Sequence, residues 1–178
     1  MDRPDLVSQI PGLRRYARAL TGDAWAADDL VQDTLERACS KWRLWSIGSD
    51  LRAWLFTIMH NVYVSDVRQI VRQRRAGTSH NLDDVAHELI APDMAQDATI
   101  DLQRCLLQLP EEQRSVLLLA SVEDMDYATI ARVTGVPVGT VMSRLSRART
   151  RLQALLDTPT KTLAQERGSS VIPLRRPS

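Results

Sequence analysis

Hydrophobic residues recur with a helical period along most of the chain. In the last periodic segment the apolar positions follow one another at steps of four, three, four and three, namely Val141, Leu145, Ala148, Leu152 and Leu155. That spacing places them on one buried face of an α-helix. No segment shows the strict alternation of a half-buried β-strand, so the pattern predicts an all-α fold.

The same period predicts where the individual helices lie. In the first half of the chain we expect helices over 6–20, 25–42 and 51–74. In the second half, Pro110 should end one helix and begin the next, because proline lacks the N–H that a helix interior needs. We expect the helix that begins at Pro110 to continue over 116–122. Two further helices should lie at 127–133 and 138–156, joined by a turn over 134–137.

The aromatic residues divide the chain into two modules. Seven of the eight aromatic residues fall within the first 63 positions, which leaves only Tyr127 beyond. This predicts two small helical domains with separate cores, at 1–76 and 99–157. Residues 77–98 are polar and acidic and show no apolar period, which is typical of a flexible linker. Residues 158–178 hold three prolines and are expected to be a disordered tail.

Composition and charge narrow the class of protein. The chain has 178 residues, 44% of them hydrophobic and 25% charged, the balance of a soluble globular protein. Its net charge of +1 hides a segregation, because 38–76 holds seven basic and two acidic residues whereas 77–112 holds one basic and eight acidic residues. Basic residues gather again at 144–151. Two separate basic patches favour a protein that contacts nucleic acid in two places.

Several other classes lack support in the sequence. The longest stretch without a charge, 53–65, is shorter than the roughly 18 residues of a membrane span, and the first residues are acidic rather than a basic start to a secretory signal. We therefore expect a cytoplasmic protein without membrane insertion. Cys39 and Cys105 lie in no CxxC or Cys/His cluster, so we expect small core residues rather than a disulfide or zinc ligands.

The helix at 138–156 carries a polar face opposite its apolar stripe. Ser143, Ser146, Arg147 and Thr150 share this face, with Arg144 and Arg151 at its edge. Hydroxyl and guanidinium groups can reach base edges and phosphates. Upstream, Ala131, Gly135 and Val141 have the spacing of a helix-turn-helix. The alternative is a basic helix whose arginines only complement the helix dipole; the turn and the polar face together favour DNA binding.

The helix at 51–74 carries a second stripe. Its buried side is expected to hold Leu51, Leu55, Ile58 and Val62, and the other side Trp54, Thr57, Asn61, Ser65, Arg68 and Arg72. Aromatic, amide and basic groups in one line suit melted or single-stranded nucleic acid, whose bases stack on aromatic rings. The alternative, a core Trp54 followed by a solvated basic helix end, explains the stripe equally well on its own.

The helix at 25–42 carries an acidic stripe of Asp29, Gln32, Asp33 and Glu36. Such a stripe can be a solvated face, can dock a basic protein surface or can hold a metal ion. His60, His80 and His87 show no ligand spacing. We therefore predict no metal, no catalytic residue and no cofactor. A metal-dependent hydrolase using Asp28, Asp29, Asp33 and Glu36 stays as a distant alternative.

These three faces, in this order on two modules, resemble bacterial sigma factors of the extracytoplasmic-function (ECF) type. The resemblance extends over about 6–156 and is carried by the segments 28–34, 51–58, 109–114 and 136–145. It implies a region 2-like helical bundle and a region 4-like helix-turn-helix. It also implies a non-enzymatic subunit that binds core RNA polymerase, recognises the -10 and -35 promoter elements and helps to open the duplex, while polymerase performs the chemistry.

The resemblance also assigns roles to residues. The face that would dock core polymerase comprises Asp28, Asp29, Gln32, Asp33 and Glu36. The residues expected at the melted -10 element are Trp45, Trp54, Thr57, Asn61, Ser65 and Arg68. Those expected at the duplex -35 element are Thr140, Ser143, Arg144, Arg147 and Arg151. Met142 stands where some relatives place an arginine, and could meet a thymine methyl instead.

The family further implies an anti-sigma factor, often membrane-anchored, that wedges between the two modules or wraps them. The nearest rival is a helix-turn-helix regulator that binds duplex DNA alone, usually as a symmetric dimer. Such a regulator would need a ligand pocket or a dimer face in the first module instead of the Trp54/Asn61/Arg68 stripe.

Overall fold

The computed structural model describes residues 6–45, 49–75 and 94–157, and within these ranges the regular structure is entirely helical, as predicted. The first module contains α1 (Leu6–Thr21), α2 (Ala24–Ser40), the short 3-10 helix η1 (Trp42–Leu44) and α3 (Leu51–Arg75). The second contains α4 (Met94–Leu107), α5 (Glu111–Ser121), α6 (Tyr127–Thr134) and α7 (Val138–Asp157). No helix in these ranges is both long enough and apolar enough to cross a bilayer.

One glycine and two aspartates set helix ends in the first module. Gly22 has a φ of 74°, the left-handed region that glycine adopts without strain, and its N–H closes α1 on the Arg18 carbonyl at 2.9 Å. Asp23 then caps α2, because its carboxylate accepts from the Ala26 N–H at 2.7 Å. Asp50 does the same for α3 through the Ala53 N–H at 3.1 Å. These caps place α1 and α2 in a tight helical hairpin.

Two helix boundaries differ from the prediction. The second helix ends at Ser40, and Trp42 lies in η1 rather than in the helix expected over 25–42. The fourth helix begins at Met94, inside the linker predicted over 77–98. Good helix formers such as Ala95 and Ala98 allow the helix to begin ahead of the module boundary expected at residue 99. The rest of that linker and the tail at 158–178 lie outside the described residues.

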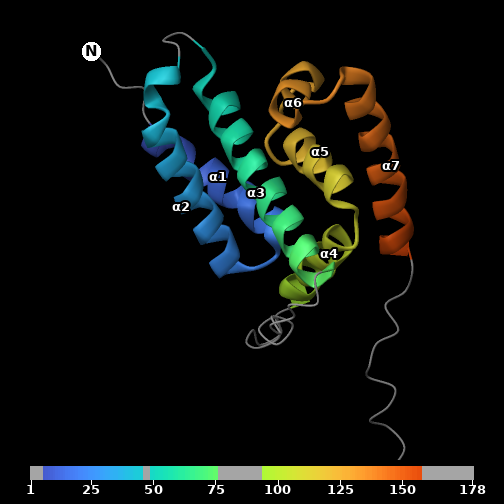
Figure 1. Cartoon of the computed structure of the whole chain (residues 1–178). Helices are drawn as coiled ribbons and strands as arrows, with labels where there is room; N and C mark the ends of the chain where they lie inside the picture. The colour runs from blue at the N-terminus through green and yellow to red at the C-terminus, as the bar shows by residue number, and fades with distance from the viewer. Residues whose placement is uncertain (1–5, 46–48, 76–93, 158–178) are drawn as a thin grey trace, which may run out of the picture.

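The two modules pack directly against each other (Figure 1), with α3 against α6 and α1 against α4 and α5. Buried apolar residues of both modules form one continuous cluster, so the prediction of two separate cores is wrong. The physical reason lies in α3, where Leu55, Phe56, Met59 and Val62 are all buried. Because these positions cover more than one side of the helix, α3 contributes to both modules at once.

The cysteines are less buried than expected. Cys39 is exposed, Cys105 is half-buried, and both are free thiols. Ala38 occupies the core position of the last turn of α2, so the adjacent Cys39 is turned away from the core by one helical step. The prediction that both cysteines are core residues is therefore wrong for Cys39.

Candidate functional site

The predicted helix-turn-helix is formed by α6, a three-residue turn and α7. Asp126 begins α6 by accepting from the Thr129 N–H at 2.8 Å, and the hydrogen bonds from the Thr129 N–H and hydroxyl hold the pKa of this carboxyl below its usual range. Gly135 ends α6 with a φ of 69°, and its N–H donates to the Ala131 carbonyl at 2.9 Å. Pro137 then accepts from the Thr140 N–H at 2.9 Å and starts α7. The turn is thus set by local backbone chemistry.

The last helix presents the face that the sequence predicted. Val141, Leu145 and Ala148 are buried, whereas Ser143 and Arg147 are exposed, as is Arg151. The Arg147 guanidinium lies over the preceding turn, with Nη2 3.2 Å from the Ser143 hydroxyl and Nε 3.2 Å from the Ser143 carbonyl. This places a guanidinium and a hydroxyl side by side on the solvent side of α7. Groups of this kind can bind base edges when a helix lies in the major groove of duplex DNA.

Arg144 and Thr140 differ from the rest of this predicted set, because both are half-buried. Arg144 Nη2 lies 2.7 Å from Glu112 Oε2, an ion pair that joins α7 to the start of α5. Glu112 was not among the predicted site residues, although it belongs to the segment 109–114 that carried the resemblance. Met142, the departure from the family pattern, is 53% exposed on α7.

Three tryptophans gather at the junction of η1 and α3. The Trp42 ring centroid lies 5.4 Å from that of Trp45 and 6.0 Å from that of Trp54, the latter pair edge to face. All three side chains are half-buried. The structure therefore brings Trp45 and Trp54 together through Trp42, which was expected as the last residue of the helix at 25–42 and not at the -10 element. Their shared partly exposed surface, the tryptophan face, is suited to stacking with unpaired bases.

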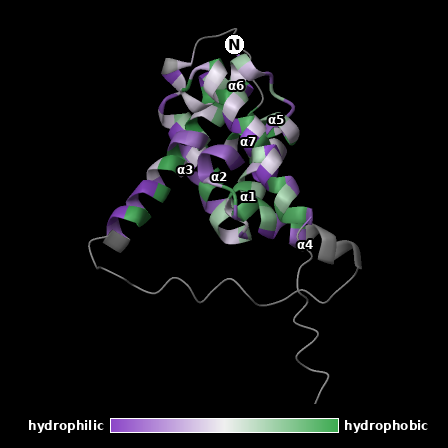
Figure 2. Cartoon of the chain, turned by 90° about the vertical axis from the view of Figure 1, so that its right-hand side faces the viewer, coloured by the Kyte–Doolittle hydropathy of each residue, from purple (hydrophilic) through white to green (hydrophobic). Residues whose placement is uncertain are grey.

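The predicted stripe continues along α3 beyond the tryptophan face. Thr57 is half-buried and its hydroxyl donates to the Ala53 carbonyl at 2.8 Å, whereas Asn61, Ser65 and Arg68 are exposed. Every residue from 68 to 73 is exposed, and Figure 2 shows this end of α3 extending away from the helical body. The helix thus offers an amide, a hydroxyl and then guanidinium groups in sequence from its aromatic start.

His60 lies on the buried side of α3 with 9% relative exposure. Burial is the main cause that lowers the pKa of its imidazole to about 4, and the positive charges of Arg144 and Arg68 contribute to the same shift. The side chain is therefore neutral at neutral pH. Because Arg144 belongs to α7, part of this pKa shift comes from the second module.

The acidic stripe lies on the outer side of α2. Asp28, Asp29, Gln32 and Glu36 are exposed, and Asp33 is half-buried. Gln32 Nε2 donates to Glu36 Oε1 at 2.9 Å, and Asp28 lies 3.6 Å from Arg14 Nε. Asp66 of α3 is exposed and interacts with this face. Desolvation raises the pKa of its carboxyl, the negative charges of Asp33 and Asp29 raise it further, and the positive charge of Arg37 opposes them. Asp66 was missed, although it is one of only two acidic residues in the basic span 38–76.

Metal chemistry gains no support from these carboxylates. Within the described ranges, no three His, Cys, Asp or Glu side chains come together as a metal-binding group would require. The hydrolase alternative needed a second set of inward-facing ligands beside Asp29 and Asp33.

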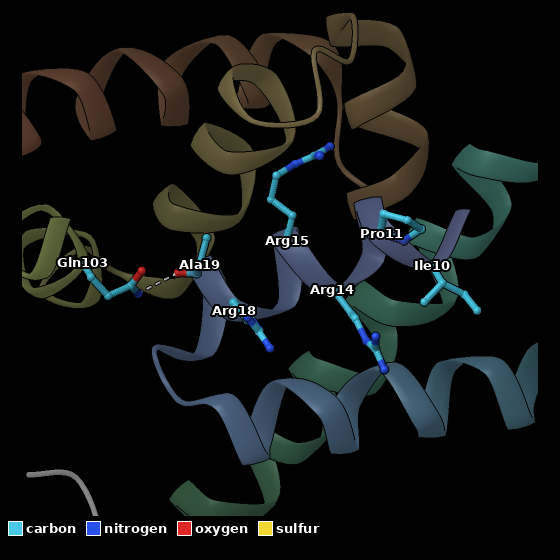
Figure 3. A pocket seen from close by; sticks show the side chains of 7 residues that line it. All are labelled: Ile10, Pro11, Arg14, Arg15, Arg18, Ala19 and Gln103. Carbon is cyan, nitrogen blue, oxygen red and sulfur yellow. Dashed lines mark hydrogen bonds between the residues drawn. The ribbon is translucent and has the colours of Figure 1, made fainter. Parts of the chain in front are cut away.

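A groove of about 610 Å³ lies between α1 and α4 (Figure 3). It is lined by Ile10, Pro11, Arg14, Arg15, Arg18, Ala19 and Gln103. Gln103 Nε2 donates to the Ala19 carbonyl at 3.1 Å across the contact between the modules. Six of its seven lining residues belong to α1 and one to α4, so the groove borders the contact between the modules.

Two family models match the chain, one on each module. The first, described as the Sigma2 domain of PhyR, matches residues 6–60. The second, described as Sigma-70, region 4, matches residues 99–152. The first match contains the acidic face and the tryptophan face, and the second contains the helix-turn-helix.

Relatives and solved structures agree with this division. The ECF RNA polymerase sigma factor EcfG of Rhodopseudomonas palustris is 38% identical over 157 residues, covering 86% of this chain and 84% of the relative. The ECF RNA polymerase sigma factor SigC of Mycobacterium tuberculosis is 34% identical over 140 residues, covering 76% of this chain and 73% of the relative.

Among solved structures, the sigma factor RpoE in complex with the anti-sigma factor NepR from Bartonella quintana has a TM-score of 0.71 and 38% identity, covering 86% of this chain and 95% of that one. CnrH in complex with the cytosolic domain of CnrY has a TM-score of 0.63 and 27% identity, covering 87% of this chain and 86% of that one. A family model matches each module, and the sigma factor EcfG is 38% identical over 157 residues. The chain therefore belongs to the family of ECF RNA polymerase sigma factors.

Proposed function

We propose that this sigma factor divides its work among three helices. The acidic face of α2, centred on Asp29 and Glu36, docks core RNA polymerase. The tryptophan face and the exposed stripe of α3 from Asn61 to Arg68 hold the melted -10 element. The exposed side of α7, with Ser143 and Arg147, reads the duplex -35 element. Polymerase performs the chemistry, so the chain itself needs no catalytic group or cofactor, and it works in the cytoplasm where polymerase is.

The observation that carries this proposal is the separation of three chemistries on three exposed surfaces. Carboxylates gather on α2, aromatic and amide groups on α3, and hydroxyl and guanidinium groups on α7. A basic protein surface, unstacked bases and duplex DNA are respectively the partners that such groups bind.

An anti-sigma factor is the second partner that we propose. The support is the 38% identical sigma factor from Bartonella quintana, whose structure is a complex with the anti-sigma factor NepR. We expect such a partner to prevent the binding of polymerase or of promoter DNA.

Transcription by purified bacterial core polymerase on a fragmented genomic library tests the proposal. With this protein present, mapped RNA 5′ ends should reveal new start sites that share a two-part upstream motif. Variants of α3 and of α7 should then alter the requirement for the -10 and the -35 part of the motif separately.

Specific duplex binding by the protein alone, without new start sites, would instead favour the helix-turn-helix regulator. A regulator of that kind should also bind its site as a symmetric dimer. Sedimentation of the protein with a duplex of the selected sequence distinguishes one bound copy from two.

A further inference from the structure

The loop between α5 and α6 places a carboxylate inside the molecule. Glu123 follows the end of α5 by two residues, and its side chain has 0% exposure. Two guanidinium groups of the first module bind it, with Arg15 Nε donating to Oε1 at 3.0 Å and Arg52 Nη2 donating to Oε2 at 2.6 Å. A buried carboxylate is strongly destabilising unless it is paired and hydrogen-bonded. Glu123 therefore depends on the first module for its partners.

The first module is shaped to receive this carboxylate. Arg52 Nη2 also donates to the Glu123 carbonyl at 2.7 Å, and its guanidinium lies 5.5 Å from the Phe56 ring centroid. Gly12 on α1 faces the same carboxylate, and a Cβ at this position would lie 3.2 Å from Glu123 Oε2, closer than ordinary contact. We call Gly12, Arg15 and Arg52 the carboxylate site.

A second polar contact closes the same interface. Arg114 of α5 is buried and donates from Nη2 to the Tyr63 hydroxyl of α3 at 2.7 Å. Its Nη1 donates to the Leu107 carbonyl at 3.1 Å. Together with the bond from Gln103 to the Ala19 carbonyl, these contacts join α4 and α5 to α1 and α3. The two modules are thus held by specific polar bonds as well as by apolar packing.

The packed arrangement is too short to bind both promoter elements at once. Elements centred at -10 and -35 are about 25 base pairs apart, or roughly 85 Å at 3.4 Å per base pair. The longest helix of the second module, α7, has 20 residues and a length of about 30 Å. Because α3 contacts α6 directly, the tryptophan face and α7 lie within one compact body. The contact between the modules must therefore break before both elements are bound.

We propose that the carboxylate site is a latch that holds the free sigma factor closed. Its occupant is Glu123 of the same chain, bound by Arg15 and Arg52. Release of Glu123 separates the second module from the first and lets each module reach its own promoter element. This inference rests on the proposed function, because the need to open follows from binding two separated elements.

The latch is tested by measuring the distance between the modules in the full chain. One fluorophore is attached to the exposed Cys39 of α2 and the other to the exposed position of Arg149→Cys on α7, in a chain that also carries Cys105→Ser. Glu123→Gln removes the charge and keeps the side-chain size. Asp124→Asn is the matched control, because it makes the same change at the next, exposed residue, whose φ of 50° asparagine tolerates.

We expect the unmodified chain and Asp124→Asn to show one short distance. Glu123→Gln should raise the ratio of open to closed molecules at least about tenfold, because the two arginines lose their anionic partner. Arg52→Gln should do the same, and the double variant should add little to either single change. Arg52 is 38% exposed on the first module, so this variant keeps the test valid if Glu123→Gln misfolds. Equal distance distributions in Glu123→Gln, Arg52→Gln and Asp124→Asn would overturn the latch.

The latch and the proposed function can fail separately. The distances are measured without polymerase, so an unmodified chain that is already open would overturn the latch while leaving transcription intact. Conversely, a chain that opens on Glu123→Gln but gives no new transcription starts would overturn the function and not the contact. Adding core polymerase with a promoter fragment that carries both elements should lengthen the distance in the unmodified chain. An unchanged short distance in a transcribing complex would also overturn the latch.

Discussion

Arg144 and Arg147 lie about one turn apart on α7, yet they differ in exposure and in bonding partners. Arg144 is 20% exposed and bound to Glu112, whereas the exposed Arg147 contacts only its own helix through Ser143 in the hydrogen bonds found among the described residues. A guanidinium already engaged with a carboxylate has fewer donors left for a base. Arg144 therefore fixes α7 on α5, and we propose that promoter reading on α7 falls mainly to Arg147.

Replacing Arg147 by alanine should weaken binding to the cognate -35 duplex by about 1–3 kcal/mol if the guanidinium reads a base edge. The loss should be smaller for a scrambled duplex, because phosphate contacts do not depend on sequence. Equilibrium binding of both duplexes at several salt concentrations measures this difference. Arg149→Ala, also exposed on α7, is the control. An equal loss on both duplexes would make Arg147 a phosphate contact.

His60 gives the folded protein a pH dependence that can be isolated by mutation. Its folded-state pKa of about 4 lies below the ordinary value of 6.5, so the unfolded chain binds more protons between these two values. Stability should therefore fall as the pH drops from 7 toward 4, and the His60 contribution at pH 5 should be about 2 kcal/mol.

Urea unfolding at pH 7 and pH 5, compared between the unmodified chain and His60→Leu, measures this contribution. Carboxylates also titrate near pH 5, but they are common to both proteins and cancel in the comparison. The variant should lose less stability than the unmodified chain on acidification. Equal losses in the two proteins would show that His60 does not carry the effect.

At the scale of elements, replacing either of two glycines around the turn of the helix-turn-helix by alanine should change the stability of the protein, with opposite signs. Gly135 has a φ of 69°, so Gly135→Ala should destabilise the protein by about 1–2 kcal/mol through backbone strain, although no atom lies within 4 Å of the new Cβ. Gly139 lies inside α7 with the same free space, so Gly139→Ala should stabilise by about 0.5 kcal/mol. Thermal unfolding of both variants checks the opposite signs. Equal shifts would exclude the left-handed turn as the cause.

The acidic face of α2 should act as a unit. Asp29→Lys combined with Glu36→Lys should abolish binding to core polymerase, because two attractive contacts become repulsive. The neutral pair Asp29→Asn and Glu36→Gln should lose less. Both positions are exposed, so helicity and binding of the -35 duplex should stay unchanged and serve as controls. Retained assembly of the doubly reversed variant with polymerase would contradict this role for α2.

Long periodic helices were predictable, and the segments around them less so. The apolar stripe of α7 and the alternation of buried and exposed positions on α3 follow from the helical period alone, and Val141, Leu145 and Ala148 are buried as expected. The end of α2 at Ser40 and the helix η1 were not predictable, because Trp42 also fits the apolar period and its ring contacts with Trp45 and Trp54 leave no trace in that period. Because Trp42 fits that helical period, the sequence did not predict that it belongs to the tryptophan face.

At the scale of the whole molecule, the contact between the modules left no signal in the sequence. Glu123 is 108 positions from Arg15 and 71 from Arg52, and Arg114 is 51 from Tyr63. A charged residue is usually exposed, so its type gives no reason to expect a buried partner so far away. The three candidate faces could be predicted as surfaces because each lies within one helix or its flanks, whereas the interface joins residues of different helices.

In the closed chain, the contact between the modules should couple their unfolding. All four tryptophans lie in the first module, so their fluorescence reports on that module, whereas far-ultraviolet circular dichroism reports on both. In urea the two signals should give the same midpoint, as a cooperative transition requires. Independent modules would give two midpoints instead.

The interface bond from Arg114 to Tyr63 should then stabilise both modules equally. Tyr63→Phe leaves the buried Arg114 Nη2 without its 2.7 Å acceptor, and such a loss destabilises by about 1–3 kcal/mol. Because the core is shared, both midpoints should move by the same amount, whereas Tyr127→Phe, at a residue 39% exposed, should move neither. A shift confined to the tryptophan signal would mean that Tyr63 stabilises the first module alone, and that the two modules do not fold as one unit.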